Sequence, residues 1–178
     1  MVYTGDGKGK TTAAMGLVMR AWTQGIPVGV YQFIKAAKWP TGERFAGQAL
    51  ATVHTEKKQG GPIEWHNFGA GRTSKRATRE IDQSELARQG WSRVRQDLAA
   101  QAHGLYVLDE FCHVLARGWI DVDEVIEVLS NRPGTQHVVI TGRNAPDKLI
   151  EFADLVSEVV NIKHPIDLGI KGQPGVEW

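Results

Sequence analysis

The sequence predicts an α/β domain in which a mostly parallel sheet carries helices on both faces. Short apolar runs alternate with helical patterns along the chain, and this alternation is typical of parallel strands joined by helices. A glycine-rich loop lies between the first apolar run and the first helical pattern. The 178 residues have the size of one ordinary domain, and no linker separates two cores, so we expect a single domain over residues 1–178.

Composition narrows the class of protein. The 21 Lys and Arg nearly balance the 20 Asp and Glu, and the net charge is only +1. A protein that neutralises many phosphates is usually more basic, so we expect no nucleic-acid partner. A single cysteine, Cys112, excludes an internal disulfide and suits a reducing compartment. Neither a leader peptide nor an apolar run of about 18 residues is present, so we expect a cytoplasmic protein without a membrane anchor.

The first elements enclose the glycine-rich loop. We expect a short strand at Met1–Tyr3 and a helix at Lys10–Gln24, and Gly25 followed by Pro27 gives the usual signal for a helix end. Val28–Ile34 is nearly continuous in apolar residues, which predicts a strand buried on both faces.

The middle of the chain is less regular. Residues 35–81 contain several glycines and prolines, and within them we expect only a short strand at Ile63–His66. Asp82 and Glu85 have the spacing of a capping box and would begin the next helix. The face of that helix that packs on the sheet would consist of residues at steps of four, namely Leu86, Gly90, Val94 and Leu98.

The last part of the chain returns to alternating strands and helices. Leu105–Leu108 is an apolar strand that ends at two carboxylates, Asp109 and Glu110. Asp121 and Glu124 would cap another helix. The remaining expected elements are the inner face of that helix at Val122, Val125, Ile126 and Leu129, a strand at Val138–Ile140, a helix from Pro146 to Ala153, a last strand at Val159–Ile162 and a loop-like tail at 163–178.

The glycine-rich loop has the pattern of a phosphate-binding loop, or P-loop. It reads Thr-Gly-Asp-Gly-Lys-Gly-Lys-Thr-Thr at residues 4–12, although the usual pattern has glycine where this chain has Thr4. Glycines let backbone N–H groups turn toward anionic oxygens, and the helix behind adds unpaired N–H groups and its dipole. Lys10 would place its ammonium on the phosphates of ATP, and Thr11 its hydroxyl on Mg²⁺. The residues expected to bind the nucleotide are Gly5, Asp6, Gly7, Lys8, Gly9, Lys10, Thr11 and Thr12.

Asp109 and Glu110 are the acidic partners expected of such a loop. In open α/β sheets ligands bind at the carboxyl ends of the strands, so both carboxylates should lie near it. Successive strand residues point to opposite faces, so one carboxylate should serve the magnesium ion and the other should be structural. We take Thr11, Glu110 and Asp109 as candidate metal ligands, and Lys10, Thr11 and Glu110 as candidate catalytic residues. A helix-capping acidic pair is the alternative interpretation.

Three further groups of residues are weaker indications of a functional site. Arg20 and Arg143 are candidates for phosphate contacts or for structural roles. Cys112 and His113 have no second pair of ligands at metal spacing, so we expect ordinary helix residues. A local basic run indicates either a solvated face or contact with an anionic ligand. It consists of Arg72, Lys75, Arg76 and Arg79.

With these motifs the chain resembles the ATP:corrinoid adenosyltransferases, and the departure at Thr4 is shared by that family. The resemblance implies a RecA-like P-loop fold and a homodimer. It also implies transfer of the 5′-deoxyadenosyl group of ATP to the Co(I) of a reduced corrinoid, with release of triphosphate, in adenosylcobalamin biosynthesis or salvage. The corrinoid would be cob(I)yrinic acid a,c-diamide, cobinamide or cobalamin, and an electron donor such as a flavoprotein would supply Co(I). The segments that carry the resemblance are Tyr3–Gly16, Gly29–Lys35, Trp39–Glu43, Leu105–Glu110, Asn131–Pro146 and the tail Lys163–Trp178.

Two departures from the family and three alternatives accompany this interpretation. We expect the N-terminal extension of the family to be absent, and Arg72 and Ser74 stand where relatives carry an aromatic pair that helps to remove the lower ligand of cobalt. Another P-loop ATPase or kinase would release phosphate or ADP instead of triphosphate. A nucleic-acid motor domain and a nucleotide-binding regulator without turnover are alternatives from other classes.

Overall fold

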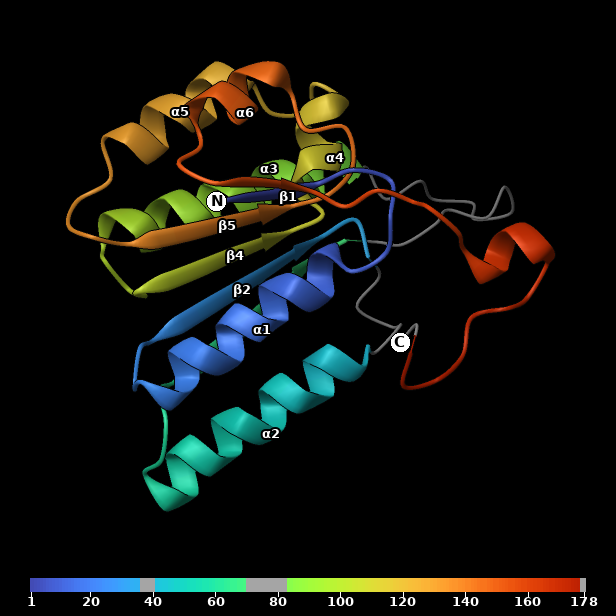
Figure 1. The fold of residues 1–178 in the computed structure, drawn as a ribbon. Helices are drawn as coiled ribbons and strands as arrows, with labels where there is room; N and C mark the ends of the chain where they lie inside the picture. The colour runs from blue at the N-terminus through green and yellow to red at the C-terminus, as the bar shows by residue number, and fades with distance from the viewer. Residues whose placement is uncertain (36–40, 70–82, 177–178) are drawn as a thin grey trace.

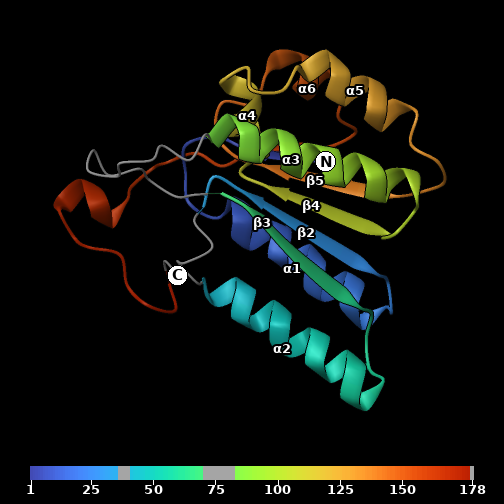
Figure 2. The same cartoon turned by 180° about the vertical axis from the view of Figure 1, so that it is seen from behind.

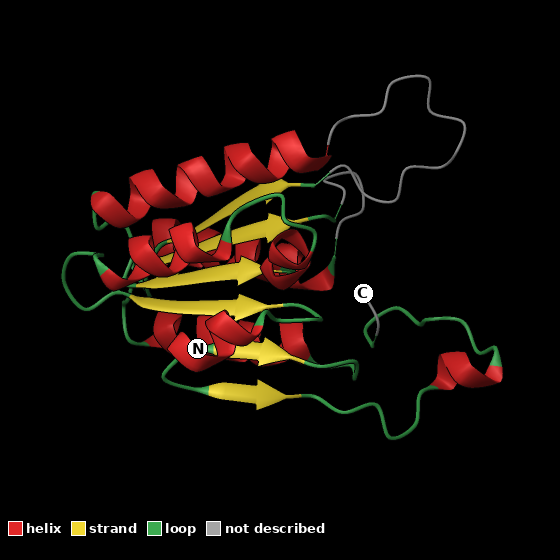
Figure 3. Ribbon diagram, turned by 90° about the horizontal axis from the view of Figure 1, so that it is seen from above, coloured by secondary structure: helices red, strands yellow, loops and turns green. Residues whose placement is uncertain are grey.

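The computed structural model, which describes residues 1–35, 41–69 and 83–176, has the expected parallel sheet (Figure 1). Its strands are β1 (Val2–Thr4), β2 (Val28–Phe33), β3 (Ile63–Phe68), β4 (Leu105–Asp109), β5 (His137–Thr141) and β6 (Val156–Glu158). They form one six-stranded sheet in the order β3-β2-β4-β5-β1-β6, and every pairing is parallel. Figure 3 shows that all the arrows point the same way, so the carboxyl ends of the strands meet at one edge.

Helices cover both faces of the sheet, as predicted (Figures 1 and 2). They are α1 (Lys10–Thr23), α2 (Gly42–Lys57), α3 (Gln83–Ala99), α4 (Phe111–Ala116), α5 (Val122–Ser130) and α6 (Asp147–Phe152), with a 3₁₀ turn at Pro165–Leu168. The first two helices lie on one face and the other four on the opposite face. Because strand residues alternate, Val30 of β2 packs with Val18 of α1, whereas Tyr31 belongs to the cluster that contains Trp91 of α3.

The helix predictions from apolar period and caps are mostly confirmed. The first helix ends at Thr23, one residue before the predicted end. On α3, Gly90, Val94 and Leu98 are buried as expected, but Leu86 is only half-buried and Ala87 takes its place in the core. Asp82 lies outside the described residues.

The cap of α5 differs in part from the prediction. The Asp121 side chain accepts a hydrogen bond from the backbone N–H of Asp123 at 2.8 Å, as an N-cap should. Glu124 does not complete the predicted capping box, because its carboxylate instead accepts hydrogen bonds from Trp91 and Arg95 of α3. The acidic residue therefore joins two helices rather than closing one.

The sequence interpretation missed α2. This 16-residue helix occupies part of the stretch predicted to be irregular. Of its residues only Gly47 is buried, and a Cβ there would lie 3.1 Å from the ring of Trp65. Leu50 and Ala51 add partly buried contacts. The helix packs on the sheet through a narrow apolar face, so the helical spacing of its apolar residues was weak in the sequence.

The predicted last strand at Val159–Ile162 is wrong, because the strand that pairs with β1 is Val156–Glu158. Two hydrogen bonds of 2.8 Å set this register, one from Val2 N–H to Leu155 O and one from Val159 N–H to Thr4 O. Beyond β6 the chain crosses the glycine-rich loop, where Gly7 N–H donates to Val159 O at 2.7 Å.

Gly7 has no room for a side chain at this crossing. A Cβ there would lie 2.6 Å from the carbonyl oxygen of Val160, so the close approach of the two backbones requires glycine. Farther along, the tail residues around the 3₁₀ turn are largely exposed. Within the described ranges, none of the helices has both the length and the apolar character needed to span a bilayer.

Candidate nucleotide-binding site

A cleft of about 340 Å³ opens at the carboxyl edge of the sheet, above the glycine-rich loop. It is lined by Asp6, Gly7, Lys8, Gly9, Lys10, Thr11, Thr12, Lys35, Glu43, Glu110, His113, Arg143 and His164. A hollow of about 370 Å³ near Met1, Leu129 and Phe152 is slightly larger, but it lies away from the loop and from the carboxyl ends of the strands. The cleft over the loop is therefore the candidate nucleotide site.

The loop leads into α1 with its backbone groups free of side-chain caps. Gly9 is the N-cap residue, and its φ of 122° lies in the region that favours glycine. No side chain caps the helix start, so the first N–H groups of α1 can receive an anion. Thr4 ends β1 and is buried, and its hydroxyl accepts a hydrogen bond from Ala145 N–H at 3.3 Å. The unusual threonine is thus part of the packing beneath the loop.

Lys10 is folded back onto the loop. Its Nζ donates to the carbonyl oxygens of Gly5 at 2.7 Å and Gly7 at 2.6 Å, and the residue is 8% exposed. Burial lowers the pKa of Lys10, and the nearby Arg143 guanidinium lowers it further. The two carbonyls hold the ammonium at the inner side of the loop, and its contact with phosphate stays a prediction.

Asp109 is the centre of the site. This fully buried carboxylate accepts hydrogen bonds at Oδ1 from Thr11 and Thr141, both at 2.8 Å, and at Oδ2 from Lys35 at 2.9 Å and Gln32 at 3.2 Å. Burial alone would raise the pKa of Asp109, but the Lys35 ammonium and the other donors lower it below its usual value. The carboxylate is therefore ionised and joins the start of α1 to the ends of three strands.

Glu110 has a different environment from Asp109, as predicted for neighbouring carboxylates. It adopts a left-handed conformation with φ 63° at the start of α4, and its side chain is 22% exposed in the cleft. Its Oε2 lies 3.0 Å from Nε2 of His113. Because four donors already surround Asp109, Glu110 is the carboxylate with room for a ligand.

The two arginine candidates separate in the structure. Arg143 lines the cleft and donates from Nη2 to the carbonyl oxygen of Asp6 at 3.0 Å, so it supports the loop. Arg20 is exposed in the last turn of α1, ten residues beyond Lys10, which is about 15 Å along a helix. Arg20 therefore does not line this cleft, and a contact between Arg20 and phosphate stays a prediction.

Four cleft residues were missed in the sequence, namely Lys35, Glu43, His113 and His164. Lys35 follows β2, and its position at the carboxyl end of a parallel strand is the signal that could have identified it. Burial alone would lower the pKa of Lys35, but the Asp109 carboxylate outweighs this effect and raises it. The other three come from α2, α4 and the tail, and no local motif marks them.

Cys112 and His113 are helix residues of α4, as expected. Cys112 is fully buried, and burial raises the pKa of its thiol to about 12, so it remains protonated and is a poor metal ligand. His113 reaches the cleft, which the sequence interpretation did not foresee. Ser74 and the whole basic run, Arg72, Lys75, Arg76 and Arg79, lie outside the described residues.

The oxygen donors of the cleft suit a hard divalent cation. Thr11 offers a hydroxyl, while Glu110 and Glu43 offer carboxylates that line the same space. Mg²⁺ prefers oxygen ligands and is usually held by one or two carboxylates together with substrate phosphates. The residues present therefore fit Mg²⁺ bound with a nucleotide.

Comparison with known proteins identifies similar chains over the full length. The family model described as ATP:corrinoid adenosyltransferase BtuR/CobO/CobP matches residues 1–178. A corrinoid adenosyltransferase of Escherichia coli (strain K12) is 38% identical over 178 residues, covering 100% of this chain and 84% of the relative. One from Pseudomonas aeruginosa is 40% identical, covering 100% and 82%. One from Sinorhizobium sp. is 40% identical over 179 residues, covering 100% and 79%.

Proposed function

We infer that the chain, which belongs to the ATP:corrinoid adenosyltransferase family, binds MgATP in the cleft over residues 4–12 and releases triphosphate as it adenosylates a corrinoid. ATP-dependent adenosylation of corrinoids follows from the family, whose model covers all 178 residues. The same match gives no support to the alternative of another P-loop ATPase or kinase. The observation that supports our assignment of the site is the hydrogen bond between Thr11 and Asp109, which joins the loop to the acidic end of β4.

The triphosphate is proposed to lie on the loop and the start of α1. Lys10 would then exchange its two carbonyl partners for phosphate oxygens, and charge-assisted hydrogen bonds of this kind are stronger than neutral ones. Lys8, Lys35 and Arg143 line the same cleft and add positive charge around the anion. Backbone N–H groups and the helix dipole complete a site for a polyanion.

We propose that Thr11 and Glu110 hold Mg²⁺ together with the phosphates, while Asp109 orients the Thr11 hydroxyl from beneath. The hydrogen bond from Thr11 to Asp109 directs a lone pair of the hydroxyl oxygen away from the buried carboxylate. Glu110 is the partly exposed carboxylate beside it. When bound, Mg²⁺ neutralises part of the charge of the leaving triphosphate.

The proposed reaction is a displacement at C5′ of ATP. A Co(I) corrinoid is itself a strong nucleophile, so the protein needs no general base to activate it. Cobalt supplies the electron pair of the new Co–C bond and becomes formally Co(III), while the C5′–O bond breaks and its electrons stay on the triphosphate. The chain must hold C5′ in line with cobalt and stabilise the leaving group, and Lys10 with the loop N–H groups suits the second task.

Further partners are proposed from the family likeness alone. We propose a cytoplasmic homodimer that receives its Co(I) substrate after reduction by an electron donor such as a flavoprotein. Cob(I)yrinic acid a,c-diamide, cobinamide and cobalamin are the proposed corrinoid substrates.

The proposal can be tested by anaerobic incubation of the protein with MgATP and each of the three corrinoids in chemically reduced form. We expect the spectrum of an adenosylated corrinoid, which disappears on exposure to light because its Co–C bond is photolabile. The Lys10→Ala variant is the control and should form little product. A folded wild-type protein that forms no light-sensitive product with any of the three corrinoids would contradict the proposal.

A further inference from the structure

Three potential metal ligands lie together at the end of the sheet opposite the nucleotide cleft. Glu64 and His66 belong to the edge strand β3, and His103 lies just before β4 begins. One ligand atom from each residue lies within 4.8 Å of the other two. The amino ends of the parallel strands meet here, so the cluster is separate from the residues assigned to ATP.

The backbone brings these side chains to one face. Glu64 and His66 are two residues apart on a strand and therefore point the same way. The ring of His66 stacks on that of Tyr31 at 4.9 Å between centroids, which places both on the α3 side of the sheet. The His103 ring covers the backbone of Gly29, where a Cβ would lie 2.4 Å from the ring carbon Cδ2. Glycine at position 29 thus leaves the space that the imidazole occupies.

The two imidazoles present nitrogen atoms that lack hydrogen-bond partners. Among the residues that the structure describes, no donor or acceptor is bonded to the buried Nε2 of His66 or of His103. The His103 side chain is only 3% exposed. The Nε2 atoms lie 3.4 Å and 4.0 Å from the same oxygen, Oε2 of Glu64. A buried nitrogen without a partner is destabilising, and a bound cation would satisfy both.

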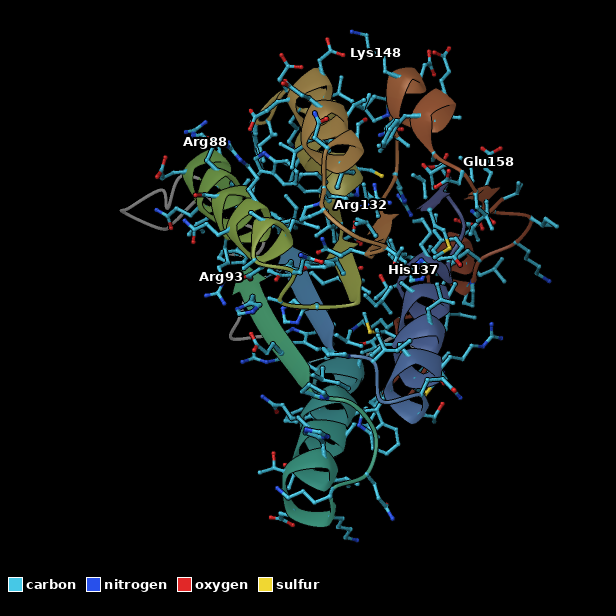
Figure 4. All side chains as sticks on the ribbon, turned by 90° about the vertical axis from the view of Figure 1, so that its left-hand side faces the viewer. Arg88, Arg93, Arg132, His137, Lys148 and Glu158 are labelled. Atoms are coloured by element: carbon cyan, nitrogen blue, oxygen red, sulfur yellow. The ribbon has the colours of Figure 1, made fainter. Side chains whose placement is uncertain are left out.

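The charges around the cluster favour a cation. Glu64 and Asp97 bring two carboxylates, against one guanidinium from Arg93. Arg93 donates to Asp97 at 2.6 Å, while its Nη2 is 3.8 Å from Glu64, so its charge is directed mainly to Asp97. Figure 4, which faces the amino ends of the strands, shows Arg93 of α3 beside β3. Burial lowers the pKa of His103.

We propose that Glu64, His66 and His103 form a binding site for Zn²⁺. Two imidazole nitrogens and one carboxylate suit Zn²⁺, whereas Mg²⁺ prefers oxygen ligands alone. Tetrahedral Zn²⁺ with ligands at about 2.0–2.1 Å needs donor atoms about 3.3 Å apart. The two nitrogen–oxygen distances are 3.4 Å and 4.0 Å, and all three donor atoms lie within 4.8 Å of one another, so the donors must draw closer around the ion. The Glu64 side chain is 55% exposed and the His66 side chain 21% exposed, so both can move toward the ion, and the exposed side of Glu64 leaves a fourth position for water.

The bound ion would tie two separate parts of the chain together. In the sheet β2 lies between β3 and β4, so Zn²⁺ would link the edge strand to the connection that leads into β4. The site would therefore stabilise the fold, and its occupancy would not depend on ATP.

The test is a titration of tag-free protein, stripped of metal, with Zn²⁺ in competition with a chromophoric chelator. We expect one Zn²⁺ per chain and a rise in Tm of about 5–11 °C at a hundredfold excess of free Zn²⁺ over Kd. Glu64→Gln is the leading variant because this exposed side chain can change without disturbing the core. It and His66→Gln should each weaken binding at least about tenfold. With Co²⁺ in place of Zn²⁺, we expect the intense visible absorption of a four-coordinate site, which Glu64→Gln should reduce.

Two histidine variants serve as matched controls. His137→Gln changes an exposed histidine at the same end of the sheet, well separated from Arg93 in Figure 4. His113→Gln changes the histidine that faces Glu110 in the nucleotide cleft. Neither should alter Zn²⁺ affinity. Absence of binding at one ion per chain, binding that survives Glu64→Gln and His66→Gln, or loss of binding in His113→Gln would each overturn the proposal.

Discussion

Replacing Asp109 with asparagine should destabilise the fold and weaken MgATP binding together. The native carboxylate accepts two hydrogen bonds at each oxygen, from Thr11 and Thr141 at Oδ1 and from Gln32 and Lys35 at Oδ2. Asparagine keeps one acceptor oxygen, and its amide nitrogen is a donor. If the oxygen stays with the two threonines, the amide N–H groups face two other donors. The variant therefore loses two hydrogen bonds, one of which is the ion pair with Lys35.

The expected loss of stability follows from those two hydrogen bonds. A hydrogen bond to a charged group contributes about 1.5–3 kcal/mol. The Lys35 side chain is 31% exposed and can turn toward water, which recovers part of the loss. We expect the free energy of unfolding to fall by about 3 kcal/mol. For a chain of this size that is a fall in Tm of about 6–12 °C.

The effect of Asp109→Asn should depend on pH in a defined direction. The pKa of Asp109 is lowered in the folded protein, so its contribution to stability is complete above the unfolded pKa of about 4 and is lost as the pH falls through the lower folded pKa. The pKa of Lys35 is raised, so its contribution is complete below about pH 10.5 and is lost only as the pH rises through the higher folded value. The difference in Tm between wild type and variant should be constant from about pH 5 to pH 9 and shrink below about pH 4.

The assay is thermal unfolding followed by circular dichroism, together with calorimetric titration with MgATP. For thermal unfolding, Glu110→Gln is the matched control, because it changes the neighbouring carboxylate, whose contact with His113 is partly exposed. A contact of this kind contributes about 0–1 kcal/mol, so the control should lower Tm by no more than about 4 °C. An Asp109→Asn variant with a Tm within about 2 °C of wild type and an unchanged MgATP affinity would show that Asp109 does not join the loop to the sheet in this way.

Four further substitutions test other parts of the site. Lys10→Ala should weaken ATP binding about 10- to 150-fold in a calorimetric titration, because it removes about 1.5–3 kcal/mol of charge-assisted contact. Lys148→Ala, which changes an exposed lysine, is the control and should bind ATP normally. Wild-type ATP affinity in a folded Lys10→Ala variant would contradict the assignment of the loop. Thr11→Ala and Glu110→Gln should each raise the Mg²⁺ concentration needed for half-maximal adenosyl transfer. If that concentration is unchanged in Glu110→Gln, this carboxylate is not a ligand. Gly7→Ala would place a Cβ 2.6 Å from the carbonyl oxygen of Val160 and should lower the free energy of unfolding by about 1–3 kcal/mol in a denaturant titration. An unchanged unfolding midpoint would show that the segment after β6 can move away from the added methyl group.

The fold was predictable where the pattern was strong and local. The helix α1 follows a glycine-rich loop and ends before a glycine and a proline, so its bounds were nearly right. The helix α2 carries a narrow apolar face in which only Gly47 is buried, and period alone could not identify it. The last strand was misplaced because Val159–Ile162 has more β-favouring residues than the exposed edge strand Val156–Glu158. Pairing with β1, rather than the composition of the segment, decides its position.

The residues of the site were also predictable only where a local motif marks them. Lys10 and Thr11 belong to one short motif, and the strand before Asp109 indicated where the acidic end would lie. Lys35 contacts Asp109 across 74 residues of sequence, and His164 reaches the cleft from the tail. Such contacts depend on the order of strands and on the path of the tail, which no local pattern records.

The proposed reaction requires that the cleft present C5′ of ATP, rather than a phosphorus atom, to the nucleophile. The most direct measurement separates the phosphate-containing products by anion-exchange chromatography, with and without chemically reduced corrinoid. We predict that triphosphate appears one for one with adenosylcorrinoid, and that ATP turnover without corrinoid stays at background. Steady release of ADP and phosphate in the absence of corrinoid would contradict the account and favour a P-loop ATPase.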